Sequence, residues 1–189
     1  FKRARDTERI RALALMGETV RLAKLLEQHG IPAVFLKGPL LALQLYGDVS
    51  LREAGDIDIL VHEHRLDDVH RLLTRNGFHV QPRRHDSFFS SKSARKSHVK
   101  RVHHIGYSGS LTGSGKKTRV ECHYRLFNNP ALFPFPADCL EAHTGGSRWV
   151  EYGGTGFRLL PETDDILYLL AHGAVHQWYH LKWLLDISR

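Results

Sequence analysis

A short apolar segment that carries two aspartates, GDIDILV at residues 55–61, constrains the fold and the chemistry of this chain more than any other stretch. Isoleucine, leucine and valine in so short a run indicate a buried strand. Because strand side chains alternate between faces, Asp56 and Asp58 lie on the same face. Adjacent carboxylates repel each other and lose hydration on burial, and a bound divalent cation is the usual reason for such a pair. The alternative is a turn-capping Asp56 and a solvated Asp58, and this segment alone does not decide between them.

The sequence just before this strand favours an anion-binding turn. The apolar run IPAVFL predicts a strand over 32–36, and the helical segment after it predicts a helix over 39–46. Between them lie Lys37, Gly38 and Pro39, and proline suits the first helical position. A glycine turn at a helix N-terminus presents free backbone N–H groups, which bind anions such as phosphate.

These segments together resemble the DNA polymerase β-like nucleotidyltransferase superfamily. The resemblance lies in the LKG turn, the following helix, LYGD, Arg52 and GDIDILV, and the C-terminal text LAHGAVHQWYHLKWLLDI is similar to a branch described as uncharacterised nucleotidyltransferases. It extends from about residue 30 to residue 189 and is weakest over 82–118. The superfamily turn is usually Gly-Ser or Gly-Gly, whereas Pro39 here removes one backbone donor, and we expect Lys37 to compensate.

The resemblance implies an α/β (α+β) nucleotidyltransferase fold, with a short mixed sheet, flanking helices and a C-terminal helical pair. It also implies transfer of an NMP from an NTP, with ATP the expected donor, to an acceptor hydroxyl on a small molecule or protein. Two Mg²⁺ ions, which Mn²⁺ could replace, would assist the transfer. The implied metal ligands and catalytic residues are Asp56, Asp58 and Glu121. The implied nucleotide ligands are Lys37, Gly38 and Arg52.

Glu121 lies on a strand predicted over 118–126 and shares a face with His123, while Val120 and Cys122 share the other face. The resemblance makes Glu121 the third carboxylate, since the family pattern there is Glu-x-His followed by an aromatic residue. A surface glutamate paired with an arginine is the alternative. His123 could orient a ligand, contact substrate or simply lie on the sheet.

Three histidines recur every four residues near the C-terminus, at His172, His176 and His180, and would line one face of a continuous helix. No neighbouring cysteine or acid completes a zinc set, so structural or substrate-contact roles are favoured, with His176 and Lys182 as candidate contacts. Lys182 could equally be a surface partner of Asp186, four residues later. The residues expected in the core here are Leu169, Leu170, Leu181, Leu184, Leu185, Trp178 and Trp183.

The net charge of +7 is concentrated in one segment. Ten basic residues between Arg83 and Arg119 face one acidic residue, Asp86, which gives this segment +9 and leaves −2 for the rest. The segment could bind phosphate or nucleic acid, but a solvated loop is favoured over 87–97. The alternative function is therefore an inactive nucleotidyltransferase-like module that binds RNA or a protein partner through this segment.

Size and composition indicate a globular chain of one core with extensions. We expect an N-terminal helix over 1–30, a nucleotidyltransferase core over 31–160 with a basic loop at 82–118, and a helical region over 161–189 that continues beyond the last residue. The sequence contains no run of about 18 apolar residues, so it predicts no membrane span. Cys122 and Cys139 lack metal-type spacing, so a reduced protein in the cytoplasm is expected.

Overall fold

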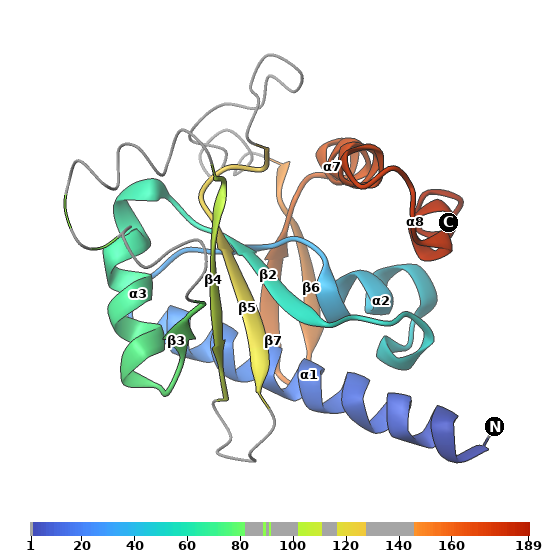
Figure 1. Ribbon diagram of the computed structural model, residues 1–189, viewed down its shortest axis with the longest axis horizontal. Coiled ribbons are helices and arrows are strands. Elements are labelled where there is room, and N and C mark those ends of the chain that lie inside the picture. Colours follow the sequence, from blue (N-terminus) through green and yellow to red (C-terminus); the bar gives the residue numbers. More distant parts are fainter. Residues whose placement is uncertain (1, 82–88, 90, 92–101, 111–116, 128–145) are drawn as a thin grey trace.

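The computed structural model describes residues 2–81, 89, 91, 102–110, 117–127 and 146–189, and these form a mixed sheet with helices on both faces (Figure 1). The seven strands lie in the order β3-β4-β5-β2-β1-β7-β6, which confirms the predicted α/β class. Cys139 and most of the basic segment lie outside the described residues. The strands are β1 (Val34–Phe35), β2 (Asp56–Leu60), β3 (His79–Val80), β4 (His104–Gly109), β5 (Thr118–His123), β6 (Arg148–Tyr152) and β7 (Thr155–Leu159).

The central strand β2 is the GDIDILV segment, and it has neighbours of both directions. It runs antiparallel to β1 and parallel to β5, while β1 is parallel to β7. The outer pairs β3–β4, β4–β5 and β6–β7 are antiparallel. Because β2 has a neighbouring strand on each edge, its backbone N–H and C=O groups can be hydrogen-bonded on both sides. This pairing holds the backbone that carries Asp56 and Asp58 in place.

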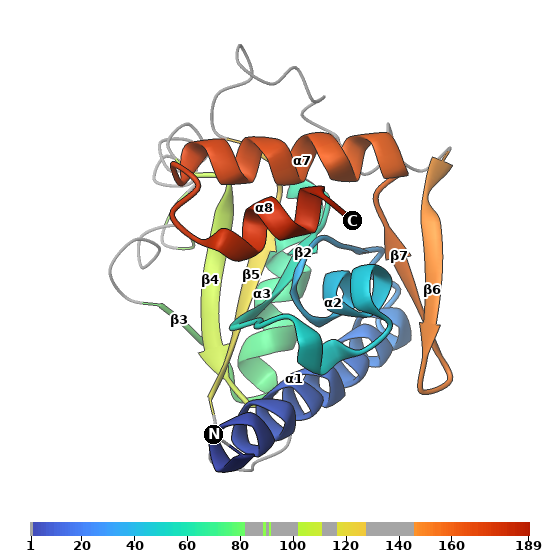
Figure 2. The same cartoon turned by 90° about the vertical axis from the view of Figure 1, so that its right-hand side faces the viewer.

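One face of the sheet is covered by α1 (Lys2–Gln28) and α3 (Leu66–Arg75), as Figures 1 and 2 show. Ile57 and Ile59 of β2 belong to the same buried cluster as Met16 of α1 and Val69 of α3. The N-terminal helix expected over 1–30 therefore forms, and both α1 and α3 bury their apolar sides on the sheet. The odd-numbered side chains of β2 are fixed in the core, which turns Asp56 and Asp58 to the other face.

The second face carries a smaller apolar cluster and the C-terminal helices. Leu60 of β2 packs with Val34, Leu36 and Tyr168, and Tyr168 belongs to α7 (Glu162–Val175). Figure 2 shows α7 and α8 (Leu181–Ile187) side by side across this face. The remaining helix, α2 (Gly38–Tyr46), follows β1 directly, and the short 3₁₀ turns are Val49–Leu51 and Glu63–Arg65.

The C-terminal residues form the expected helical pair rather than one continuous helix. The backbone leaves helical geometry at Gln177 and Trp178, whose φ angles are +54° and +53°. The Trp178 ring packs closely against Gly173, and a Cβ atom on Gly173 would lie 2.4 Å from the ring. Only glycine therefore leaves room for the ring at this turn. The chain therefore breaks into α7 and α8.

Several residues expected in the core of this region are instead on the surface. Leu169 is buried as predicted. The four leucines for which the prediction was wrong are 38–70% exposed, because the break turns their sides of α7 and α8 to solvent; they are Leu170, Leu181, Leu184 and Leu185.

Among the described residues, none of the helices is both long enough and apolar enough to cross a membrane.

Candidate functional site

A cleft of about 560 Å³ lies between the second face of the sheet and the helices α7 and α8. This volume is in the range of small-molecule sites, about 300–1,000 Å³. Its sheet side is lined by charged groups from β2 and β5, and its helix side by aromatic groups. Every residue that the sequence singled out lines this cleft: Lys37, Gly38, Arg52, Asp56, Asp58, Glu121, His123, His176 and Lys182.

The carboxylates meet because β2 and β5 pair in parallel with Asp58 opposite Glu121. Asp56 lies two residues earlier on the same face, and Asp58 is only 2% exposed. Ligand atoms of Asp58, Glu121 and His123 lie within 4.8 Å of one another. The predicted faces of both strands are thus correct, and side chains distant in sequence form one acidic cluster.

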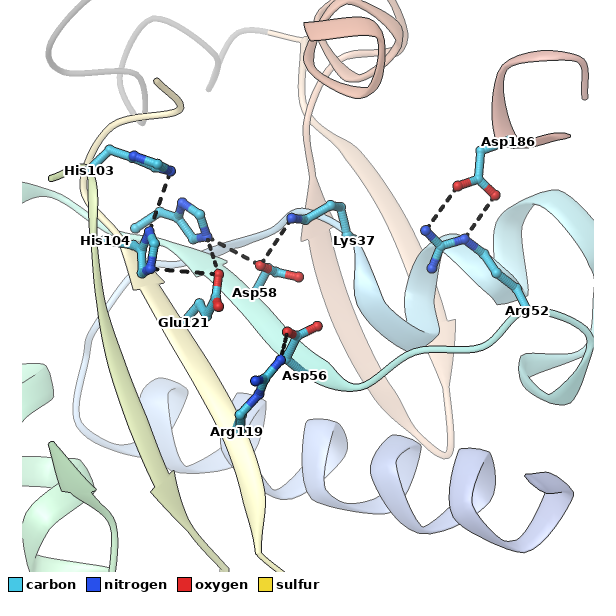
Figure 3. A network of polar contacts seen from close by, with 10 residues as sticks. Lys37, Arg52, Asp56, Asp58, His103, His104, Arg119, Glu121 and Asp186 are labelled. Carbon is cyan, nitrogen blue, oxygen red and sulfur yellow. Dashed lines mark hydrogen bonds and ion pairs between the residues drawn. The ribbon is translucent and has the colours of Figure 1, made fainter. Parts of the chain in front are cut away.

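Each carboxylate of this cluster has a basic neighbour, and Figure 3 shows the network. The ammonium of Lys37 lies 3.3 Å from Oδ1 of Asp58. Nε2 of His123 lies 3.2 Å from the same oxygen and 3.6 Å from Oε2 of Glu121. Arg119 donates to Oδ2 of Asp56 at 2.9 Å. The sequence analysis gave Arg119 no role in the site, although its position two residues before Glu121 places it on the same strand face.

These contacts shift the pKa values of the carboxylates in opposite directions. Burial alone would raise the pKa of Asp58, but the charge of Lys37 and the hydrogen bond from His123 lower it. Burial likewise opposes ionisation of Glu121, yet the His123 hydrogen bond lowers its pKa to about 2. Asp56 has a raised pKa, because burial and the charges of Asp58 and Glu121 outweigh Lys37 and Arg119. Asp58 and Glu121 are therefore anions at neutral pH.

The turn Lys37-Gly38-Pro39 fits closely against β2. Gly38 has a φ of +64°, and a Cβ atom there would lie 3.0 Å from the backbone oxygen of Asp56. Glycine is required on both grounds. Pro39 occupies the start of α2, and the N-terminal end of this helix lies beside the carboxylates. The turn thus combines a helix N-terminus with the ammonium of Lys37, as an anion site requires.

Arg52 lines the cleft, but its guanidinium is paired with the carboxylate of Asp186. Its guanidinium donates to both oxygens of Asp186, at 2.8 and 2.9 Å, and both side chains are buried. Lys182 donates to the backbone oxygen of Glu53 at 3.2 Å. The alternative of a surface pair between Lys182 and Asp186 does not form, since Asp186 is 4% exposed and pairs with Arg52. Nucleotide binding by Arg52 stays a prediction.

The helix side of the cleft is an aromatic cluster around Trp183. The rings of His172, His176 and His180 lie 5.2, 5.3 and 5.0 Å from the indole. His176 ends α7 and His180 precedes α8, so the break between the helices gathers these rings. Burial, followed by the charge of Lys37, lowers the pKa of His172 to about 3. Aromatic rings that are tilted or perpendicular to one another thus face the charged floor.

Two further histidines, which the sequence analysis missed, lie beside Glu121. His104 is opposite His123 in the β4–β5 ladder, and His103 precedes it. Nε2 of His104 is 3.9 Å from Oε2 of Glu121, and its Nδ1 is 3.4 Å from Nε2 of His103. The pairing of β4 with β5 is the signal that could have placed them, because directly opposed residues share a face.

Comparison with known proteins gives a family and a fold. A family model described as "Uncharacterised nucleotidyltransferase" matches residues 1–189. The chain is also similar to the solved structure of an antigenic nucleotidyltransferase-like protein from Paracoccidioides brasiliensis, with a TM-score of 0.56 and 18% sequence identity, over 93% of this chain and 74% of that chain. At this identity the likeness shows the fold alone. No curated protein matches the chain.

Proposed function

The chain belongs to the family of uncharacterised nucleotidyltransferases, and on that basis we propose that its cleft transfers an NMP from an NTP, with ATP the expected donor, to an acceptor hydroxyl. The observation that carries this proposal is the in-register placement of Asp58 opposite Glu121, with Asp56 on the same face. Three carboxylates gathered in one cleft beside a helix N-terminus suit a reaction in which phosphate charge has to be neutralised.

The donor set fits a hard divalent cation. Asp56, Asp58 and Glu121 offer oxygen ligands, which Mg²⁺ prefers, and Mn²⁺ accepts the same set. Three carboxylates against Lys37, Arg119 and His123 also leave the cluster able to accept added positive charge. When bound, Mg²⁺ would neutralise phosphate oxygens and lower the pKa of the acceptor hydroxyl.

Lys37 and Gly38 are placed to hold the triphosphate. The ammonium of Lys37 lies on the cleft floor at the start of α2, where it can neutralise either Asp58 or a phosphate oxygen. Gly38 lets the helix N-terminus approach β2 without a side chain in between. We therefore assign the phosphates to this end of the cleft.

Glu121 serves in this proposal as a ligand rather than as the base. Its pKa of about 2 makes its carboxylate a weak proton acceptor near neutral pH. An anion that stays ionised is instead suited to holding a cation throughout the reaction. Nε2 of His123 contacts the carboxylates of both Glu121 and Asp58, which helps to hold them in position.

The nucleoside is assigned to the helix side of the cleft. Trp183 and the rings of His176 and His180 offer flat faces to a base. Stacking of a base on an aromatic side chain typically contributes about 1–3 kcal/mol. Phosphates at α2 and a base at α8 would span the cleft, which leaves the acceptor at the end near β4.

The test is to incubate the protein with each labelled NTP, Mg²⁺ and a cell extract, and to identify any labelled product. Asp58→Asn should abolish labelling, whereas the control Asp68→Asn, in a half-buried aspartate of α3 that pairs with Arg65 and Arg71 outside the cleft, should not change it. Absence of both labelling and Mg-NTP binding in the parent protein, together with salt-sensitive RNA binding, would instead favour the inactive binding module.

A further inference from the structure

We propose a second, imidazole-rich metal site at the β4 side of the cleft, formed by His103, His104 and His123, that takes a borderline transition metal such as Zn²⁺. One nitrogen from each of the three histidines lies within 4.8 Å of the others. The site does not depend on nucleotidyl transfer, and its donors differ in kind from the oxygen set of Asp56 and Asp58.

The spacing of the donors suits a tetrahedral ion. With Zn–N distances of 2.0–2.1 Å, ligand atoms of a tetrahedral site lie about 3.3 Å apart. His103 Nε2 and His104 Nδ1 are already 3.4 Å apart.

The backbone supports this cluster from two paired strands. His104 and His123 are directly opposite each other on β4 and β5, and Glu121 is two residues from His123 on the same face. The rings of His103 and His104 lie 5.4 and 5.1 Å from that of His123. Sites carried by strands hold their ligands more rigidly than sites on loops, which favours binding without rearrangement of the backbone.

One further observation points to a ligand. His123 is buried, and within the described part of the chain its Nδ1 atom has no hydrogen-bond partner. Buried ring nitrogens are normally satisfied, and metal coordination is one way to satisfy them. Three imidazoles favour zinc, cobalt, nickel or copper over magnesium, which prefers oxygen donors.

The test uses Co²⁺, which reports its geometry by visible absorption. Titration of the metal-free protein should give one equivalent of bound Co²⁺ with the strong bands of a four-coordinate ion. Zn²⁺ should displace it, whereas millimolar Mg²⁺ should not. A six-coordinate spectrum, or displacement by Mg²⁺, would place the ion on the carboxylates and overturn the proposal.

Variants separate this cluster from other histidines. His103→Gln and His104→Gln retain polar side chains, and each should weaken Co²⁺ binding by at least about 100-fold, since loss of even an outer partner of a metal ligand costs 10–100-fold. The matched control is His64→Gln, an exposed histidine stacked on His62, which should bind like the parent. Circular dichroism without metal checks that the variants fold. Parent-like affinity in both cluster variants, or equal loss in the control, would overturn the site.

Discussion

Two groups of charges at the cleft are built differently (Figure 3). The first, the lock, is Arg52 with Asp186: two donors meet two oxygens at 2.8 and 2.9 Å, and the side chains are 6% and 1% exposed. The second, the acidic cluster, is Asp56, Asp58 and Glu121 with their basic neighbours, where the contacts to Asp58 are longer, at 3.2 and 3.3 Å.

The two groups differ in how their charges are paired. In the lock, each charge has one opposite charge and a bidentate geometry, which is typical of a structural ion pair. It ties α8 to the loop before β2. In the acidic cluster, carboxylates repel one another and share their cations, so a bound ion can replace a protein cation. Burial of charge alone therefore does not identify a site, and carboxylates that share their cations make the acidic cluster the better candidate.

The largest expected effect comes from breaking the lock. Arg52→Ala leaves the Asp186 carboxylate buried without its partner, and we expect the free energy of unfolding to fall by about 3 kcal/mol. Urea unfolding measures it. The double variant Arg52→Met with Asp186→Leu removes both charges and should recover most of the loss. Equal loss in the single and double variants would show that packing, rather than charge, fixes α8.

The next effect contrasts two aspartates on one strand face. Asp58→Asn removes the anion that Lys37 and His123 stabilise, and should lower the free energy of unfolding by about 1–3 kcal/mol in metal-free buffer. Asp56 is disfavoured as an anion, as its raised pKa shows, so Asp56→Asn should leave stability equal or higher. Both variants should lose Mg²⁺-dependent transfer.

Thermal unfolding without divalent cations compares these two variants directly. A stability loss of the same size in both variants would mean that both carboxylates are fully paired, like Asp186 with Arg52. The acidic cluster and the lock would then not differ in how their charges are compensated.

A smaller effect concerns pH at the helix wall. The folded-state pKa of His172 is lowered to about 3, so the unfolded chain binds its proton first as pH falls below about 6.5. Its contribution to stability is complete above that value and is lost as pH falls toward 3. His172→Gln should remove this dependence, and the two proteins should diverge by on the order of 2 kcal/mol by pH 4.5. Urea unfolding at a series of pH values measures this, and parallel curves would contradict it.

The smallest effect separates two lysines that line the cleft. Lys37→Ala should raise the Kd for Mg-NTP by roughly tenfold, which corresponds to the loss of one charge-assisted bond. Lys37→Arg should recover only part of it, because the guanidinium is longer and planar. Lys182→Ala is the control and should have little effect in calorimetry. If only Lys182→Ala weakens binding, the phosphates lie against α8 and the proposed orientation is reversed.

The sheet and the floor of the cleft could be predicted because their signals are local. Apolar runs and alternation placed Asp56 and Asp58 on one face of β2, and the same alternation placed Glu121 beside His123. The glycine turn at Gly38 likewise depends on neighbouring residues. Each of these features follows from backbone periodicity within a few positions.

The helix wall could not be predicted from such signals. Arg52 and Asp186 are 134 residues apart, and nothing in the spacing of Lys182 and Asp186 shows that a distant arginine competes for the carboxylate. The break at Gln177 and Trp178 has neither glycine nor proline to mark it. It depends on the packing of Trp178 on Gly173, which is a tertiary contact that overrides helix propensity.

The parallel pairing of β2 with β5 also has a consequence for how the molecule folds. Asp56 and Arg119 are 63 residues apart, so the ladder that aligns Asp58 with Glu121 closes a long loop, and pairings of this kind form slowly. Mutual repulsion of the carboxylates opposes the same step until Lys37 and Arg119 arrive beside them. We therefore expect the acidic cluster to form late in folding, after the chain has collapsed around α1 and α3.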